Sequence, residues 1–387
     1  MKRILIVNNN MHIGGVQKAL LNLLHEIHGQ YEVTLLLFYG GGALRKDIPE
    51  DVSVVELNGP LRYWGMTKYD ASNGKERLAR GAWAAASRIF GRNRTMRAAC
   101  IGQKQTEHYD AAISFLHSGP RKSFYGGCNE FVLRCVNAER KITFLHCDYE
   151  KIGAACSYNQ RIYRQFDRIA ACSQGCAEAF LRVMPQLKEK TMVVPNCQNY
   201  LEIARLADME PNPLPKDRLN ILTVARLGKE KGVLRAIRAI ASLESGRKRL
   251  RYDIIGTGVE HVQAEALISK LGLTDTVCLL GEKENPYGYM RAADVLLIPS
   301  VSEAAPMVIG EAACLGTPVL TTNTSSAGEM VADTKYGWVC DNSEDGIKEG
   351  IQMLLSDPEE VQSRKQYLES LKFDNSCACT RFAELMN

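Results

Sequence analysis

Short apolar runs alternate with helix-spaced apolar positions along the first 200 residues. The run from Arg3 to Val7 is followed by a polar turn, and Val16, Leu20 and Ile27 then recur on one helix face. Further strand-like runs lie at 32–38, 52–57, 111–116, 141–145, 168–172 and 191–194. This alternation of strands and helices predicts a parallel sheet covered by helices on its faces.

A polar, proline-rich segment from Asp208 to Asp217 interrupts the pattern and is predicted to be a linker, because it has no periodicity. The pattern then restarts, with strand-like runs at 220–224, 252–255, 277–280, 295–298 and 318–322 and a helical pattern at 231–243. We therefore expect an α/β protein of two doubly wound domains that face a central cleft, where ligands of such sheets bind.

The expected bounds are 1–207 for the first domain, 208–219 for the linker and 220–371 for the second domain. The tail at about 372–387 is expected to form a helix that packs back on the first domain, through Phe373 and Phe382. The length of 387 residues agrees with two domains rather than one.

Composition narrows the class of protein. Hydrophobic residues make up 45% and charged residues 24% of the chain, as in ordinary globular proteins. No apolar run approaches the roughly 20 residues that span a bilayer, and the first apolar run is too short for a signal peptide. We expect a cytoplasmic protein.

The two halves of the chain differ in charge. Residues 1–200 carry 27 Lys and Arg against 17 Asp and Glu, whereas the remainder carries 21 against 27. This asymmetry indicates that one domain meets an anionic partner.

The 13 cysteines are scattered and none of their spacings is typical of zinc sites. We interpret them as reduced thiols, most of them buried as small apolar groups. No metal site is predicted.

Two carboxylates eight positions apart, Glu303 and Glu311, flank Pro306. Proline suits the first turn of a helix, so Glu303 is expected on a loop and Glu311 a little over one turn inside the helix. The helix N-terminus between them favours a phosphate group. Acceptors for sugar hydroxyls on both sides of an anion site fit the layout of a sugar nucleotide.

Two basic residues, Arg226 and Lys231, follow the first strand of the second domain. A guanidinium can hold phosphate oxygens in a fork, and an ammonium adds a point charge. A solvated basic turn is the alternative reading. The position at the carboxyl end of a strand favours a diphosphate site.

Glycine turns follow several of the predicted strands. They contain Gly14 and Gly15 in the first domain, and Gly256, Gly258 and Gly281 in the second. Glycine allows the backbone to approach a ligand closely, although each turn alone is also explained as a tight connection. The spacing is not G-x-G-x-x-G, which disfavours a nicotinamide-dependent oxidoreductase.

Histidines supply further candidates in the first domain. His146 ends the run at 141–145 and is followed by Asp148. At a strand tip it can bond sugar hydroxyls or carry protons. His117 and His12 are the competing candidates, since each also follows a predicted strand.

A basic stretch from Lys75 to Lys104 holds eight Lys and Arg and one acid, Glu76, with Trp83, Ile89, Phe90 and Met96 between them. Such a helical surface can lie on anionic lipid headgroups, and a solvated helix face explains it equally well. A nucleic-acid partner is not expected, because no binding motif is present.

Taken together, these features resemble the retaining sugar-nucleotide glycosyltransferases of family 4, which have the GT-B architecture of two Rossmann-like domains. The resemblance rests on Gly14-Gly15, Arg226 with Lys231-Gly232, the Gly256/Gly258 turn, Asn285-Pro286-Tyr287 and the Glu303–Glu311 pair. The chain is similar in particular to bacterial capsule and cell-surface polysaccharide transferases. It departs from the family at Ala304, where glycine is usual.

The resemblance implies a role for each of these positions. The implied catalytic residues are Glu303 and His146 at the donor sugar and Arg226 and Lys231 at the diphosphate. The implied donor-binding residues are Gly14, Gly15, Gly256, Gly258, Gly281, Lys283, the backbone of Met307 and Val308, and Glu311 at the ribose.

The implied activity is metal-independent, retaining transfer of a hexose from a nucleotide diphosphate sugar, with uridine diphosphate (UDP) preferred, and without a cofactor. The acceptor would be a saccharide or a polyprenyl-linked sugar in surface polysaccharide synthesis, with peripheral contact to an anionic membrane. A sugar-nucleotide epimerase and a non-catalytic nucleotide-sugar-binding protein are the alternatives on the same fold. A phosphorylase would need a pyridoxal lysine and a longer chain.

Overall fold

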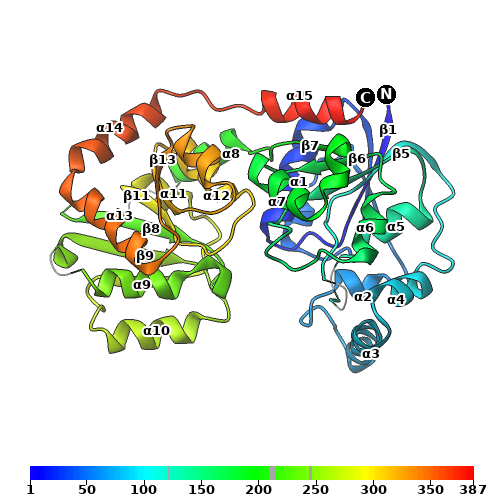
Figure 1. Cartoon of the computed structure of the whole chain (residues 1–387), viewed down its shortest axis with the longest axis horizontal. Helices are drawn as coiled ribbons and strands as arrows, with labels where there is room; N and C mark the ends of the chain where they lie inside the picture. The colour runs from blue at the N-terminus through cyan, green and yellow to red at the C-terminus, as the bar shows by residue number, and fades with distance from the viewer. Residues whose placement is uncertain (121–122, 125, 210–213, 216, 244–245) are drawn as a thin grey trace. The chain divides into compact units, whose positions relative to one another are not determined.

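The computed structural model describes residues 1–120, 123–124, 126–209, 214–215, 217–243 and 246–387. They form two compact units (Figure 1): Met1–Cys197 with Asn375–Asn387, and Gln198–Asp374. The predicted linker at 208–219 lies partly outside the described residues, which do not include 210–213 and 216.

The first unit is built on a seven-stranded parallel sheet in the order β3-β2-β1-β4-β5-β6-β7. Its strands are β1 (Arg3–Asn8), β2 (Glu32–Leu37), β3 (Ser53–Glu56), β4 (His108–Ser114), β5 (Asn137–Leu145), β6 (Arg168–Ala171) and β7 (Thr191–Val193). The strand order reverses between β1 and β4, so the turns that leave these two strands lie side by side at the carboxyl edge.

Helices cover both faces of this sheet. They are α1 (Gly15–Ile27), α2 (Arg62–Gly65), α3 (Gly74–Phe90), α4 (Arg92–Ala99), α5 (Cys128–Cys135), α6 (Ser157–Tyr163), α7 (Gln174–Val183) and α15 (Ser376–Leu385). One core cluster packs residues of β1, β2 and β4 against α2, α4, α5 and α6, and includes Phe38, Trp64 and Phe131.

The chain returns to the first unit at its C-terminal end, through α15. Phe382 of α15 is buried and meets the ring of Tyr31 edge-on at 5.9 Å, and Lys2 Nζ donates to the carbonyl of Met386 at 2.9 Å. Phe373 does not take part, contrary to the sequence prediction. It packs between Tyr200 and Tyr336 of the second unit.

The boundary between the units also differs from the prediction, since the first unit ends at Cys197 rather than at 207. Helix α8 (Tyr200–Met209) belongs to the second unit. It buries Ile203 and Ala207 in the core beside α11 and α12. The apolar face of α8 packs against α11 and α12. The sequence pattern shows that this face is apolar but not which unit it packs against.

The second unit contains a six-stranded parallel sheet in the order β10-β9-β8-β11-β12-β13. Its strands are β8 (Leu219–Val224), β9 (Leu250–Ile255), β10 (Val277–Gly281), β11 (Val295–Ile298), β12 (Val319–Thr322) and β13 (Gly337–Cys340). The main helices are α8, α9 (Val233–Ala241), α10 (His261–Lys270), α11 (Tyr287–Ala292), α12 (Met307–Cys314), α13 (Glu344–Ser356) and α14 (Pro358–Glu369). None of the described helices in either unit has the length and apolarity needed to cross a bilayer.

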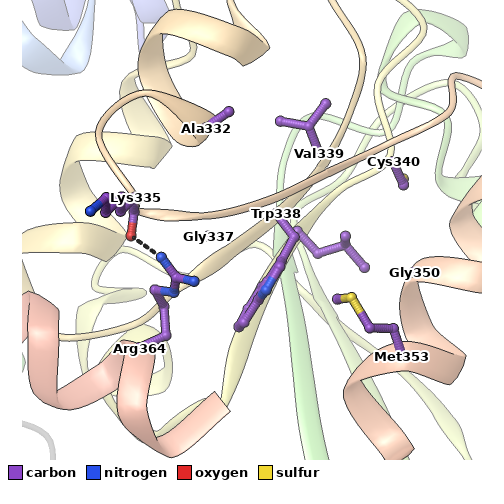
Figure 2. Close-up of a pocket in the computed structure, with 10 residues that line it drawn as sticks. Ala332, Lys335, Gly337, Trp338, Val339, Cys340, Gly350, Met353 and Arg364 are labelled. Carbon is purple, nitrogen blue, oxygen red and sulfur yellow. Dashed lines mark hydrogen bonds between the residues drawn. The ribbon is translucent and has the colours of Figure 1, made fainter. Parts of the chain in front are cut away.

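Strand β13 borders a pocket of about 620 Å³ near α13 and α14 (Figure 2). The guanidinium of Arg364 lies over the ring of Trp338, 5.5 Å from its centroid, and donates to the carbonyl of Lys335 at 3.2 Å. None of the site residues predicted from the sequence lines this pocket.

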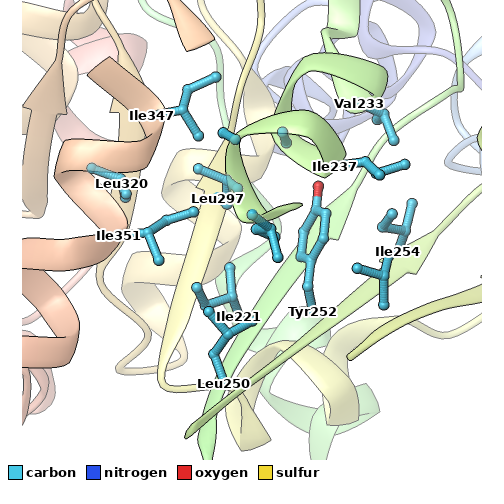
Figure 3. Close-up of a cluster of buried hydrophobic side chains, with 14 of the residues drawn as sticks. Ile221, Val233, Ile237, Leu250, Tyr252, Ile254, Leu297, Leu320, Ile347 and Ile351 are labelled. Carbon is cyan, nitrogen blue, oxygen red and sulfur yellow. The ribbon is translucent and has the colours of Figure 1, made fainter. Parts of the chain in front are cut away.

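Alternate residues of the strands face opposite helical layers. Ile221 of β8, Tyr252 and Ile254 of β9 and Leu297 of β11 pack against α9 and α13 (Figure 3). The residues that alternate with these along the strands, such as Leu222 of β8 and Leu296 of β11, point to the other face and pack against α8, α11 and α12. Both faces of every central strand are therefore buried, which is why these strands read as unbroken apolar runs.

Candidate functional site

The loop between β11 and α12 carries Glu303, and α12 itself carries Glu311, as predicted. Pro306 is the N-cap of α12, which begins at Met307. Glu303 precedes the helix on the loop, and Glu311 is its fifth residue with only 4% of its surface exposed. The first-turn N–H groups, including those of Met307 and Val308, have no acceptor within the helix. They add to the positive end of the helix dipole, which favours an anion.

Glu303 is held by partners on three segments. Lys231 Nζ and Ser300 Oγ both donate to Glu303 Oε1, each at 2.7 Å. Ser325 Oγ donates to the backbone carbonyl of Glu303 at 2.6 Å. The Lys231 and Glu303 side chains are 27% and 11% exposed. The structure thus brings together one predicted cation and one predicted carboxylate in a half-buried ion pair.

The turn that carries Lys231 is fixed against the end of β11. Gly232 has φ +68°, and a Cβ atom there would lie 2.0 Å from the carbonyl oxygen of Pro299. Val301 N–H donates to the carbonyl of Glu230 at 2.8 Å. Only glycine allows this approach, so the Lys231-Gly232 pair is required to place the ammonium beside Glu303.

Arg226 lies in a different environment. Its side chain is 72% exposed, and its Nη2 donates to Glu230 Oε1 at 2.6 Å. The structure therefore groups Arg226 with Glu230 on its own loop rather than with Glu303. A guanidinium has five donors, so an anion can be bound there while one contact to Glu230 remains.

Arg235 is a positioning residue that the sequence prediction missed. Its Nε donates to the carbonyl of Pro299 at 2.8 Å, and its Nη2 to the carbonyl of Ser300 and to Asn342 Oδ1, both at 2.7 Å. Asn342 Nδ2 in turn donates to the carbonyl of Val301 at 3.1 Å. These bonds hold the loop that leads to Glu303. The sequence signal that could have identified Arg235 is its position among the apolar residues of α9, where a charged side chain needs partners.

The glycine turn after β9 has a packing function. A Cβ atom on Gly256, where φ is +132°, would lie 2.0 Å from the carbonyl oxygen of Ala225, and one on Gly258 would lie 2.4 Å from that of Leu227. These contacts explain both glycines by the close approach of two loops. A donor contact at either of them stays a prediction.

Gly281 is the last residue of β10, the strand next to β9, and Lys283 follows it. Gly281 has φ +69° and open space around its Cα, and its carbonyl accepts from the N–H of Gly256 at 2.8 Å. Lys283 Nζ lies 5.9 Å from the ring centroid of Tyr289. The predicted contact of these two residues with a nucleotide base remains a prediction.

In the first unit, Gly14 and Gly15 form the turn from β1 into α1. Gly14 is the N-cap of α1, and a Cβ atom on Gly15 would meet nothing within 4 Å. Packing therefore does not require glycine at position 15, which leaves room there for a ligand. The neighbouring candidate His12 is engaged with Asp70, with 3.0 Å between Nε2 and Oδ2.

His146 and His117 follow the neighbouring strands β5 and β4. The ring of His146 lies against Phe115 and Phe144, with centroids 4.7 Å and 5.8 Å away. Its Nε2 atom is buried and has no hydrogen-bond partner among the described residues. Burial lowers the pKa of His146 to about 3, and His117 adds to the effect. The imidazole is therefore neutral at pH 7, and it can form a hydrogen bond with a hydroxyl group but has no positive charge.

This burial predicts a pH dependence of stability. Burial also lowers the pKa of His117 to about 4, with Arg92 contributing. Below pH 6.5 the unfolded chain protonates both histidines while the folded chain does not, so the free energy of unfolding should fall as the pH drops towards 4. The limit is about 1.4 kcal/mol per pH unit for each histidine.

Urea unfolding of the full chain at pH 7, 6 and 5 measures this slope. His146→Gln and His117→Gln should each flatten it, whereas His108→Gln, on an exposed histidine of β4, should leave it unchanged. Identical slopes for all four proteins would contradict the assignment.

A family model covers the segment of the chain that carries these residues. Residues 205–370 match the family model described as glycosyl transferases group 1. This segment contains Arg226, Lys231, Glu303 and Glu311 and coincides with most of the second unit.

Two curated relatives are bacterial. The chain is 32% identical over 213 residues to the N-acetylgalactosamine-N,N'-diacetylbacillosaminyl-diphospho-undecaprenol 4-alpha-N-acetylgalactosaminyltransferase of Campylobacter jejuni, which covers 54% of the chain and 56% of that protein. It is 32% identical over 149 residues to the amylovoran biosynthesis glycosyltransferase AmsK of Erwinia amylovora, covering 36% and 37%. The chain thus spans about half or less of the length of the curated relatives it matches.

Solved structures extend the likeness to both units. The crystal structure of Anabaena HepE in complex with UDP and glucose matches with a TM-score of 0.69 and 18% identity over 99% of each chain. At this identity the likeness establishes the fold. The solved structures that the chain resembles are GT-B glycosyltransferases. The GT-B fold expected from the sequence is therefore confirmed. The chain has the GT-B fold, and its residues 205–370 match the family model of the glycosyl transferases group 1.

Proposed function

We propose that this protein is a retaining, metal-independent glycosyltransferase that moves a hexose from a UDP-linked donor to a saccharide or lipid-linked acceptor. The observation that carries the proposal is the arrangement around the N-terminus of α12. There Glu303, which is paired with Lys231, lies on the loop before the helix, and the buried Glu311 lies within the helix. A group 1 glycosyltransferase domain over the same residues supports it.

The charges of this site suit a departing diphosphate. Lys231 has three N–H donors, so it can hold Glu303 and a phosphate oxygen at once. The first-turn amides of α12, from Met307 and Val308, add fixed donors that need no reorganisation. Glu303 is left to accept bonds from sugar hydroxyls, and Glu311 to accept bonds from the ribose.

The proposed reaction takes place on one face of the donor sugar. The acceptor oxygen bonds to the anomeric carbon, and the bond from that carbon to the diphosphate oxygen breaks. The departing diphosphate takes the acceptor proton. Lys231, Arg226 and the α12 amides stabilise its negative charge, which is the largest charge to develop in the step. His146, neutral at pH 7, would bond a sugar hydroxyl, and Gly14 and Gly15 would admit the donor phosphates to the α1 turn.

The donor and acceptor classes rest on related proteins. HepE has been crystallised with UDP and glucose, and the Campylobacter relative is named for an undecaprenol-linked acceptor. We extend both to this chain, together with a cytoplasmic place at the inner face of the membrane and a role in surface polysaccharide synthesis.

The test is incubation of the full chain with labelled UDP-, GDP- and ADP-hexoses and a membrane extract. We expect transfer of label from the UDP-hexose, with the anomeric configuration kept and no loss of rate in EDTA.

UDP should also raise the melting temperature of the protein, because a ligand at 100 times its Kd stabilises the folded state by about 2.7 kcal/mol. Glu311→Gln should remove that shift, and Glu265→Gln, on an exposed side chain of α10, should keep it.

The alternatives give different results. Release of an isomerised sugar nucleotide without acceptor would identify an epimerase, and a UDP shift without turnover a binding protein. An inverted product would refute retention, and loss of rate in EDTA would refute metal independence. No UDP shift and no transfer would refute the proposal as a whole.

A further inference from the structure

The outward face of α3 is apolar. Leu78, Ala82, Ala85 and Ile89 follow one another at intervals of four, three and four residues, which places them on one helix face. All four are exposed, Leu78 to 76% and Ile89 to 72%. We call these four residues the α3 stripe. In Figure 1, α3 lies on the outside of its unit, beyond α2 and α4.

The opposite face of α3 packs inward. Ser87 is buried, and the ring of Trp83 lies 5.4 Å from that of Trp64. This arrangement differs from the sequence prediction, which took Trp83 and Met96 as part of a basic outer surface. Met96 is fully buried in the core, and so is Arg92. The helix is thus anchored by one face while it exposes a second apolar face.

Cations flank the α3 stripe on both sides. By helix geometry, Lys75 lies along one side, and Arg77 and Arg88 along the other. All three are exposed, and among the described residues none of them has an acidic partner. The single acid of the helix, Glu76, points away from the stripe and pairs with Arg62 at 3.1 Å, with its side chain 17% exposed.

We propose that this face of α3 binds the surface of an anionic lipid bilayer. The α3 stripe would enter the boundary between headgroups and acyl chains, and Lys75, Arg77 and Arg88 would contact anionic headgroups. An apolar helix face bordered by cations is the pattern of helices that lie in the membrane interface. The proposal rests on the membrane location included in the proposed function, and it identifies the surface of the protein that would contact the lipid.

Two other partners fit this face less well. A second copy docked through the same stripe would bring Lys75, Arg77 and Arg88 of each chain next to those of the other, and like charges at close range are unfavourable. A single-stranded nucleic acid would be expected to stack its bases on aromatic side chains, whereas the stripe is aliphatic. Anionic lipid satisfies both the charge and the apolar surface.

The test is flotation of the full chain with vesicles of phosphatidylcholine alone or mixed with phosphatidylglycerol. We expect binding to the anionic vesicles that weakens as salt is added. The triple variant Lys75→Gln, Arg77→Gln, Arg88→Gln should bind about 100-fold more weakly, at about fivefold for each cation. The double variant Leu78→Gln, Ile89→Gln should lose at least about tenfold.

Matched controls lie on the second unit. Val259→Gln with Val262→Gln changes two apolar side chains that are 83% and 73% exposed. Lys270→Gln with Lys372→Gln removes two exposed cations. Both control proteins should bind the anionic vesicles like the unmodified chain, and circular dichroism should show that every variant is folded.

Several outcomes would overturn the proposal: no binding to anionic vesicles, equal binding to neutral ones, or unchanged binding of both α3 variants. So would a dimer that the Leu78→Gln, Ile89→Gln variant dissociates in the absence of vesicle binding, which would identify a second copy as the partner. The assay measures no transfer, so its failure and a failure of the proposed function are distinguishable.

Discussion

Replacing Lys231 with Met is expected to lower kcat for glycosyl transfer by about two to three orders of magnitude. That is the range found when one donor to a developing oxyanion is removed. Met keeps the length and the apolar stem of the side chain but lacks the ammonium that donates to Glu303 at 2.7 Å. The measurement is steady-state transfer from the UDP-hexose, with the melting temperature recorded alongside to confirm that the variant is folded.

Lys229→Met is the matched control, because Lys229 carries the same charge on the same turn and is exposed. Its kcat should stay within about twofold of the unmodified rate, as for surface positions outside a site. Glu303→Gln should also lower kcat, and its effect should not add to that of Lys231→Met because the two residues share one contact. Normal transfer by Lys231→Met would remove the ion pair from the mechanism.

Arg92→Met should destabilise the protein by about 3–5 kcal/mol, the cost of leaving a buried charge without its partner. Arg92 and Glu130 are both fully buried, with 2.9 Å between Nε and Oε1. Arg92 also donates to the carbonyl of Gly119 at 2.7 Å and to Asn159 Oδ1 at 2.5 Å. Loss of the guanidinium removes three hydrogen bonds and leaves the buried Glu130 carboxylate without its cation, although Tyr158 Oη still donates to Glu130 Oε1 and Asn159 Nδ2 to the carbonyl of Gly119. Urea unfolding of the full chain measures the result.

Arg94→Met supplies the comparison, since Arg94 is exposed two positions further along α4. We expect a change within about 0.5 kcal/mol there. The double variant Arg92→Met, Glu130→Gln should recover part of the loss, because no unpaired buried charge remains. If Arg92→Met cost no more than Arg94→Met, the buried network would contribute little to the fold.

The strands of both sheets were predictable because each central strand is buried on both faces. Runs such as 220–224 and 295–298 contain mostly apolar residues and correspond to β8 and β11. Strand β13, Gly337–Cys340, was missed, since four half-buried residues at a sheet edge give no distinct pattern. Its position beside β12 is decided by pairing across the sheet.

The candidate site was predictable in part. The Glu303–Pro306–Glu311 spacing gave the loop and the helix start, because proline and helix geometry are local properties. The Lys231–Glu303 contact joins residues 72 positions apart, and local sequence carries no information on it. Arg226 shows the opposite case, since a residue assigned to the diphosphate from its position is paired with Glu230.

Periodicity and capping act over a few neighbouring residues, so local patterns were enough to predict the parallel α/β architecture of the two units and the position of two carboxylates around a helix start. The folded structure was needed to show which cations meet which carboxylates, that α8 belongs to the second unit and that Arg92 is buried whereas Leu78 is exposed. These outcomes depend on which surfaces pack together, and packing joins segments that lie far apart in the chain.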